Sequence, residues 1–145
     1  MAVKPIPDGY NTLTPFCALR GCAEAIDVYR KVFGAELRMR FDAPDGTVAH
    51  CELRFGDSNV MMGEATKEVP VHNMRLMMYV PDCDATYARA LSAGFTSKEP
   101  PTNQFYGDRN ARVIDRFGNE WYVSTHVEDV SEEEMRRRMA KLAGG

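Results

Sequence analysis

The stretch RFGDSNVMM at Arg54–Met62 returns 62 positions later as RFGNEWYVS at Arg116–Ser124. In both copies Arg-Phe-Gly is followed by an acid or an amide, two variable residues and an apolar segment. Such a match at a fixed spacing indicates one supersecondary unit that is used twice. The sequence therefore predicts a duplicated unit, with Gly56 and Gly118 at equivalent hairpin turns.

The first copy is predicted to run strand, helix and three further strands. TLTPFCAL at Thr12–Leu19 is rich in strand-forming residues and is followed by a glycine. In GCAEAIDVYRKVFGAE the apolar residues recur at helical spacing until Gly34, which predicts an amphipathic helix and its end. Val48–Phe55 then alternates apolar and polar residues, and a tight turn joins it to NVMM, which is typical of a β-hairpin.

The second copy repeats this order less regularly. A strand at RLMMYV precedes a helix from about 82 to 93, and the Pro-rich FTSKEPPTNQFYG is predicted to be mostly loop. The hairpin ARVIDRFGNEWYVS closes the copy. A capping box of Ser131 and Glu134 then predicts a final helix over about 131–142. The expected organisation is a single domain, 1–145, with modules at about 10–66 and 72–128 and this C-terminal helix.

Composition narrows the class of protein. The 145 residues are 44% hydrophobic, enough for an ordinary core, and 18 basic against 21 acidic residues give a net charge of −3. Without a sustained basic stripe or an apolar run of about 20 residues, neither nucleic acid nor membrane is an expected partner. MAVKPIPDGY lacks the apolar core of a secretory signal, so we expect a cytoplasmic protein whose four cysteines are buried free thiols.

The motifs AIDVYRKVFGAE and DRFGNEWYVS, within two βαβββ units, resemble the vicinal oxygen chelate superfamily of glyoxalases, bleomycin-resistance proteins and extradiol dioxygenases. VAHCELRFGDSNVMMGE and DRFGNEWYVSTHVEDVSEEEM look like its PhnB-like, glyoxalase-related branch. The likeness covers about residues 12–135. It implies an α+β fold in which curled mixed β-sheets form a half-barrel, with helices on the convex face and a cleft on the concave face. It also implies a homodimer.

Alternation along the strands predicts which side chains enter this cleft. If the apolar positions of Val48–Phe55 pack on the helix, then His50, Glu52 and Arg54 point the other way. The 62-residue spacing places Arg112 opposite His50. It also pairs three residues of the first copy with three of the second on equivalent faces: Val60, Met62 and Glu64 with Tyr122, Ser124 and His126.

The resemblance implies metal ligands in the first strand of each module and the last strand of each hairpin. The matching positions are Thr14, Val60 or Met62, Arg75 and Tyr122. None is a good ligand, and the cation Arg75 repels a metal ion. We therefore predict no cofactor and no family-type metal ion. A displaced divalent-metal site remains an alternative, with ligands drawn from His50, Glu52, Glu64 or His126.

His50 and Glu52 are the candidate catalytic residues, as a general base and its orienting carboxylate. The alternative is that they simply form the polar face of a half-buried strand. The predicted ligand-binding residues are Thr14, Phe16, Arg54, Met62, Arg75, Tyr79, Arg112 and Tyr122. Arg75 and Arg112 are expected to contact an anion, and Tyr79 and Tyr122 to stack or hydrogen-bond. Alternatively, the arginines pair with Glu52 and Glu64 while Met and Tyr side chains fill a dimer core.

Three functions stay open at this point. The first is an enzyme acting on a small oxygenated organic substrate. The second is a non-catalytic protein that sequesters a drug or metabolite, as bleomycin-resistance proteins do, and the third is a structural or regulatory dimer. The sequence predicts a small-molecule-binding, glyoxalase-like protein that lacks the usual metal-ligand set.

Overall fold

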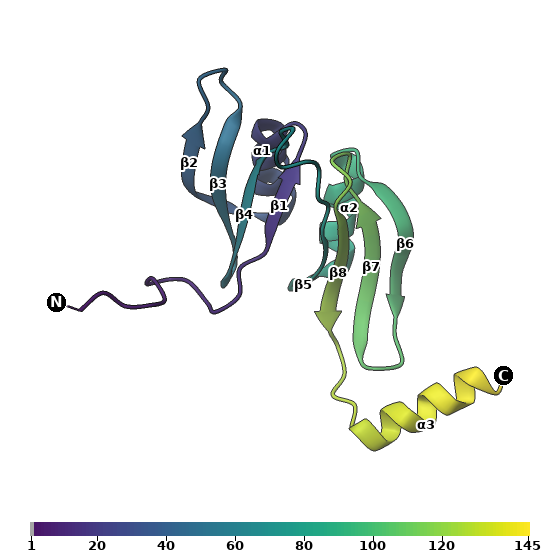
Figure 1. Cartoon of the computed structure of the whole chain (residues 1–145). Coiled ribbons are helices and arrows are strands. Elements are labelled where there is room, and N and C mark those ends of the chain that lie inside the picture. Colours follow the sequence, from purple (N-terminus) through teal and green to yellow (C-terminus); the bar gives the residue numbers. More distant parts are fainter. Residues whose placement is uncertain (1) are drawn as a thin grey trace. The chain divides into compact units, whose positions relative to one another are not determined.

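The computed structural model describes residues 2–145, which divide into two compact units with the boundary between Met74 and Arg75. Each unit is one βαβββ module, and the second carries an additional C-terminal helix (Figure 1). The predicted α+β fold of two such modules is confirmed. That they form one domain stays a prediction.

The first unit contains β1 (Phe16–Leu19), α1 (Cys22–Phe33), β2 (Glu36–Asp42), β3 (Val48–Phe55) and β4 (Ser58–Glu64). Its sheet has the order β1-β4-β3-β2, with β1 parallel to β4 and the other pairs antiparallel. Glycines with positive φ flank the helix, Gly21 at 84° and Gly34 at 68°. The Glu64 carboxylate accepts the backbone N–H groups of Gly21 and Cys22 at 2.9 and 2.8 Å, which fixes the helix start against β4.

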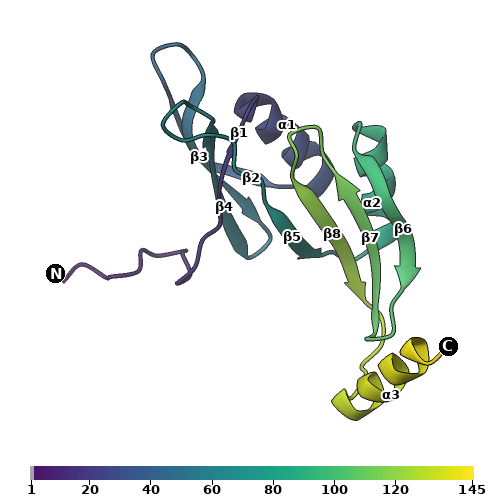
Figure 2. The same ribbon diagram turned by 45° about the vertical axis from the view of Figure 1, so that its right-hand side comes forward.

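The core of the first unit lies between α1 and one face of this sheet (Figures 1 and 2). The Sγ atoms of Cys22 on the helix and Cys51 on β3 are 3.8 Å apart, so Cys51 faces α1. Because strand residues alternate between faces, Leu53 and Phe55 share that side, and Phe55 packs on Tyr29 with ring centroids 6.0 Å apart. All four cysteines are buried.

The second unit contains β5 (Arg75–Tyr79), α2 (Cys83–Ser92), β6 (Thr96–Asn103), β7 (Asp108–Ile114) and β8 (Glu120–His126). The order β5-β8-β7-β6 and the strand directions repeat those of the first sheet. Thr125 accepts the N–H of Cys83 at 2.9 Å, as Glu64 accepts that of Cys22. The helix is also capped by Asp82, whose side chain accepts from Ala85.

The prediction of a loop before β7 is wrong, because Thr96–Asn103 is strand β6 despite Pro100 and Pro101. β6 is the edge strand of its sheet, and its pairing with β7 is irregular across this Pro-rich stretch. An edge strand tolerates proline because one row of its N–H groups has no ladder partner to lose.

The spacing between structurally equivalent residues differs from the predicted 62. The pair Cys51–Met62 of the first hairpin corresponds to Ala111–Val123 of the second, so β4 and β8 correspond at a spacing of 61 and β3 and β7 at 60. A one-residue slip moves every side chain to the other face. The predicted pairing of faces is therefore wrong: Val60, Met62 and Glu64 lie on the helix side, and Tyr122, Ser124 and His126 on the opposite side.

The hairpin turns explain the slip. Gly56, with φ 60°, lies in a two-residue turn closed by the pair Phe55–Ser58. Gly118, with φ 97°, ends a three-residue turn, and its N–H donates to the carbonyl of Asp115 at 3.2 Å. Both glycines occupy the turn of the same hairpin, but the second turn is one residue longer.

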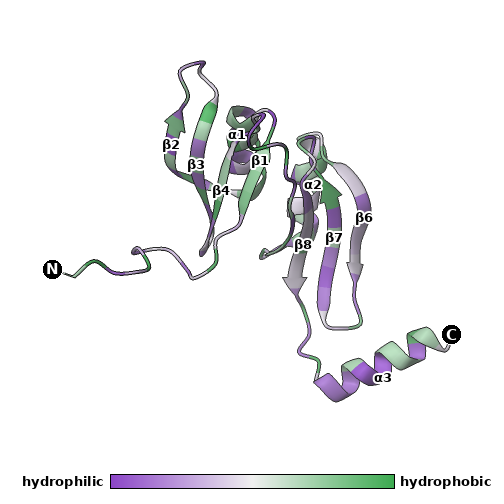
Figure 3. Ribbon diagram, viewed as in Figure 1, coloured by the Kyte–Doolittle hydropathy of each residue, from purple (hydrophilic) through white to green (hydrophobic). Residues whose placement is uncertain are grey.

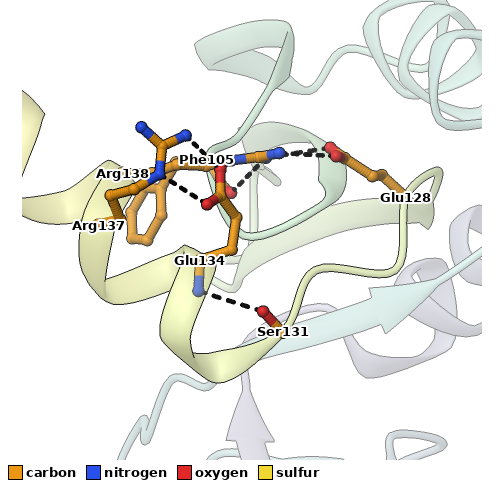
Figure 4. Close-up of polar contacts among 6 residues, drawn as sticks. All are labelled: Phe105, Glu128, Ser131, Glu134, Arg137 and Arg138. Atoms are coloured by element: carbon orange, nitrogen blue, oxygen red, sulfur yellow. Dashed lines mark hydrogen bonds and ion pairs between the residues drawn. The ribbon is translucent and has the colours of Figure 1, made fainter.

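Helix α3 (Glu132–Ala143) occupies the stretch where the final helix was predicted. The Ser131 hydroxyl accepts the N–H of Glu134, and Arg138 donates to the Phe105 carbonyl at 3.0 Å and to Glu128 at 2.7 Å (Figure 4). Contacts with Arg137 and Arg138 lower the pKa of Glu134 to about 2. Arg138 thus connects α3 to the β6–β7 turn. Within residues 2–145, no helix is long and apolar enough to cross a membrane.

Candidate ligand-binding faces

Each sheet has a face opposite its helix, called here the first and the second open face. Residues paired across neighbouring strands share a face, so the pairings define both sets. The first open face includes Phe16, Met39, Phe41, His50, Glu52, Arg54, Asn59 and Met61. The second open face includes Arg75, Met77, Tyr79, Glu99, Asp108, Asn110, Arg112, Glu120, Tyr122, Ser124 and His126.

On the first open face the structure brings His50 and Glu52 together. His50 Nε2 lies 3.2 Å from Glu52 Oε1, and the ring of His50 stacks on Phe16 with centroids 6.2 Å apart. Glu52 is only 7% exposed, and the Tyr10 hydroxyl donates to its other oxygen. This hydrogen bond raises the pKa of Tyr10. The catalytic role of His50 and Glu52 stays a prediction.

The segment before β1 crosses the first open face. The Gly9 carbonyl accepts from Asn59 Nδ2 at 2.7 Å and from Arg54 Nη1 at 3.3 Å, and the Pro15 carbonyl accepts the N–H of Met61. The Arg54 guanidinium is therefore hydrogen-bonded to the backbone of the protein's own N-terminal segment. Thr14, predicted to bind ligand, belongs to this segment and not to β1.

On the second open face one buried carboxylate holds two arginines. Glu120 Oε2 lies 2.6 Å from Arg75 Nε, and Glu120 Oε1 lies 2.8 Å from Arg112 Nη2. Arg112, followed by Arg75, lowers the pKa of Glu120. The guanidinium of Arg112 also stands 5.0 Å from the centre of the Tyr122 ring. The alternative in which these arginines pair with Glu52 and Glu64 is wrong, since their partner is Glu120.

A second group of hydrogen-bonded polar side chains lies at the other end of this face. Asp108, which is 4% exposed, accepts from the Tyr79 hydroxyl and contacts His126 Nδ1, each at 2.7 Å. His126 Nε2 lies 2.7 Å from Asp129. Asp108, and then Asp129, raise the pKa of His126 because they stabilise the imidazolium. The bond to Asp108 also raises the pKa of Tyr79.

Three buried side-chain atoms on this face have no hydrogen-bond partner: Asn110 Oδ1, Arg112 Nε and Ser124 Oγ. Asn110 and Ser124 are a cross-strand pair, exposed by 3% and 0%. Asn110 Nδ2 donates to Tyr106 in the β6–β7 turn. A buried polar group without a partner costs about 1–3 kcal/mol, and native structures contain few of them. In the described part of the chain, all three such side-chain atoms lie on the second open face.

The predicted ligand-binding residues fall into two sets. Phe16 and Arg54 lie on the first open face, whereas Arg75, Tyr79, Arg112 and Tyr122 lie together on the second. Met62 was assigned to the wrong side: it is fully buried under α1, and Met61 takes the open position. The binding roles themselves stay predictions.

Sequence reasoning did not name four polar residues of the second open face as site residues: Asp108, Asn110, Glu120 and Ser124. A signal for part of this set was available in DRNARVI, where Asp108, Asn110 and Arg112 alternate with Ala111 and Val113. Figure 3 shows this hydrophilic character along most of β7.

The residues do not fit the metal ion that the resemblance implies. Val60 and Met62 are buried on the helix side, and Arg75 is held by Glu120. Of the displaced ligands, Glu64 caps α1. Across residues 2–145, no three His, Cys, Asp or Glu side chains are grouped to hold a metal ion. These side chains therefore do not form the ligand set that the resemblance implies.

The family model for the glyoxalase/bleomycin resistance protein/dioxygenase superfamily matches residues 18–123. The uncharacterized protein Mb0911c of Mycobacterium bovis is 31% identical over 92% of this chain and 95% of its own length. Among solved structures, TioX from Micromonospora sp. ML1 superposes with a TM-score of 0.69 at 25% identity, covering 81% of this chain and 99% of TioX. TnmS3, an antibiotic binding protein from Streptomyces sp. CB03234, gives 0.63 at 20% identity, covering 87% and 98%.

Proposed function

Because the chain belongs to the glyoxalase/bleomycin resistance protein/dioxygenase superfamily, we propose that it binds a small organic molecule on the second open face without a metal ion. The observation that carries this proposal is the group of three buried, unpartnered polar atoms on Asn110, Arg112 and Ser124. A ligand that hydrogen-bonds to them recovers free energy that the unliganded protein forgoes.

The surroundings of these atoms suit an organic ligand. Tyr122 presents its ring beside Arg112, and Tyr79, 62% exposed, borders Ser124 through strand pairing. Binding sites commonly combine such apolar and aromatic surface with a few fixed polar groups. The rigid strands β7 and β8 hold the polar groups in place.

The proposed role is sequestration of a drug or metabolite in the cytoplasm by a homodimer of the PhnB-like branch. TnmS3, which shares the fold, is an antibiotic binding protein, and this supports a binding role. Sheet edges at β2 and β6 leave surface that a second chain can cover. Sedimentation that gives a monomer at micromolar concentration contradicts the homodimer.

The test is a thermal-shift screen of chelator-treated protein against a panel of small organic molecules, with metal analysis of protein purified without chelator. A ligand that binds the folded state raises Tm. We expect ligands that act equally with and without chelator and that lose their effect in Ser124→Ala. The matched control is Ser92→Ala on the exposed end of α2. Ligands that act only with a stoichiometric metal ion contradict the proposal.

A catalytic alternative is favoured by one observation, the 3.2 Å contact between His50 and Glu52 beside Tyr10. In this alternative His50 is the general base and Glu52 its orienting carboxylate. Turnover of a substrate found by screening should then fail in the double variant His50→Ala with Glu52→Gln. Turnover at the wild-type rate excludes this pair from catalysis.

A further inference from the structure

We infer that the ligand of the second open face presents an uncharged group with both a hydrogen-bond donor and an acceptor, as a carboxamide or lactam does. This inference rests on the proposed function and names the class of ligand. It is carried by two features of the face: its two arginines and the carboxylates of Asp108 and Glu120 are already paired, and its unpartnered atoms include both donors and acceptors.

The cations of this face are engaged before any ligand arrives. Arg75 and Arg112 share Glu120 at 2.6 and 2.8 Å, and Glu99 stands opposite Arg112 in the register of β6 and β7. An anionic ligand must compete with Glu120 for these guanidinium groups while facing its charge and that of Glu99. This departs from the expectation that Arg75 and Arg112 contact an anion.

A cationic ligand fits no better. The carboxylate of Asp108 is held by Tyr79 and His126, and that of Glu120 by two arginines, so neither offers a free oxygen pair. One of the atoms without a partner is Arg112 Nε, part of a permanently charged guanidinium that repels a cation. An uncharged group avoids both penalties.

The hydrogen-bonding needs of the three atoms are complementary to an amide. Arg112 Nε can only donate, Asn110 Oδ1 can only accept, and Ser124 Oγ can do either. A carboxamide supplies a carbonyl oxygen for the first and an N–H for the second on one edge. A carboxylate lacks the donor, and an amidinium lacks the acceptor.

The ligand reaches these buried atoms only when a covering side chain moves. The hydrogen bond from Asn110 Nδ2 identifies Tyr106 as one such side chain. Tyr106 lies in the β6–β7 turn next to Phe105, whose carbonyl is bound by Arg138 of α3. Tyr106 itself lies outside strands β6 and β7.

The experiment compares three molecules of the same shape: benzamide, benzoate and benzamidine, which is a cation at neutral pH. Each is titrated into 15N-labelled full-length protein, and the side-chain amide of Asn110 and the backbone N–H groups of β7 and β8 are followed by NMR. We expect benzamide to shift these signals and the two ions to bind at least about tenfold more weakly, since each leaves a buried atom unsatisfied.

Ser124→Ala separates a binding role from a structural one. Because the Ser124 hydroxyl has no partner in the protein, its removal should leave Tm unchanged or raise it, yet weaken benzamide binding about fivefold. Ser92→Ala, a matched change on an exposed helix position, should leave both quantities unchanged. A Ser124→Ala variant that loses stability but binds benzamide normally overturns the assignment of Ser124 to the ligand.

The remaining outcomes distinguish the neutral-amide inference from the proposal that the second open face binds a ligand. If benzoate or benzamidine binds at these residues as tightly as benzamide, the neutral-amide inference is wrong while ligand binding on the second open face stands. If a broader panel finds ligands that bind elsewhere and none of the three molecules shifts β7 or β8, both the inference and the proposed site are wrong.

Discussion

The two open faces belong to modules of the same topology, yet they differ in how their polar groups are satisfied. On the first open face Tyr10 and His50 contact the carboxylate of Glu52, and Arg54 donates a hydrogen bond to the carbonyl of Gly9. On the second open face Asn110, Arg112 and Ser124 each keep a buried atom without a partner. Duplication of a fold therefore does not duplicate its chemistry, and the incompletely satisfied copy is the better candidate for binding.

The largest difference in stability is expected between alanine variants of two equivalent glycines. These are Gly46 and Gly107, which end the β2–β3 and β6–β7 turns. A Cβ on Gly107 would lie 2.1 Å from the Glu128 carbonyl oxygen, whereas a Cβ on Gly46 meets nothing within 4 Å. Gly107→Ala should lower the free energy of unfolding by about 3 kcal/mol or more, because backbone must move. Chemical denaturation measures this.

Gly46→Ala is the matched control, since φ is 86° at Gly46 and 101° at Gly107. It should cost about 1 kcal/mol, the strain of a positive φ alone. Equal losses in the two variants would show that the contact with Glu128 does not distinguish the turns.

Removing the carboxylate that Arg75 and Arg112 share should cause the next largest loss of stability. Glu120→Gln leaves Arg75 and Arg112 without their common anion, and we expect a loss of about 2 kcal/mol, reduced from the buried-pair value because Arg75 is exposed. Denaturation of the wild type and variant at low and high salt checks the value. A change below about 0.5 kcal/mol would show that Glu120 does not hold the arginines in solution.

A smaller loss of stability is expected where the segment before β1 contacts the first open face. Tyr10→Phe removes the hydroxyl that donates to Glu52 and should cost about 1 kcal/mol. It should also increase amide exchange in the Gly9–Tyr10 segment. If exchange there is unaffected, the segment is held by Asn59 and Arg54 without Tyr10.

The smallest effect should be the change in stability of the second unit with pH, because His126 is half exposed. Asp108 and Asp129 raise its pKa above 6.5, so its contribution to stability is complete below pH 6.5 and is lost as the pH rises through the raised value. Tm of the wild type should therefore decrease as the pH rises above 6.5, and this decrease should be absent in His126→Gln. The same decrease in both proteins would assign it to other groups.

The order of elements was predictable because helical spacing, glycine stops and strand alternation are local signals. Alternation also placed His50, Glu52 and Arg54 correctly on the first open face. β6 was missed because proline argues against a strand, whereas its position at the sheet edge, which removes the objection, is a property of the whole sheet.

The second open face was only partly predictable. One additional residue in the turn at Gly118 reverses the faces that the repeated RFG motif assigns to β8 relative to β4, and nothing local marks that insertion. The pairing of Glu120 with two arginines depends on three neighbouring strands in register. Atoms without partners, such as Ser124 Oγ, are recognisable only when all their neighbours are placed.

The most direct test of the central claim is a crystal structure of chelator-treated protein soaked with small organic fragments. The predicted result is fragments on the second open face, hydrogen-bonded to Asn110, Arg112 or Ser124, with no metal ion in contact and the Tyr10 hydroxyl still bonded to Glu52 on the first open face. Fragments found only on the first open face, or bound on the second only through a metal ion, would contradict it.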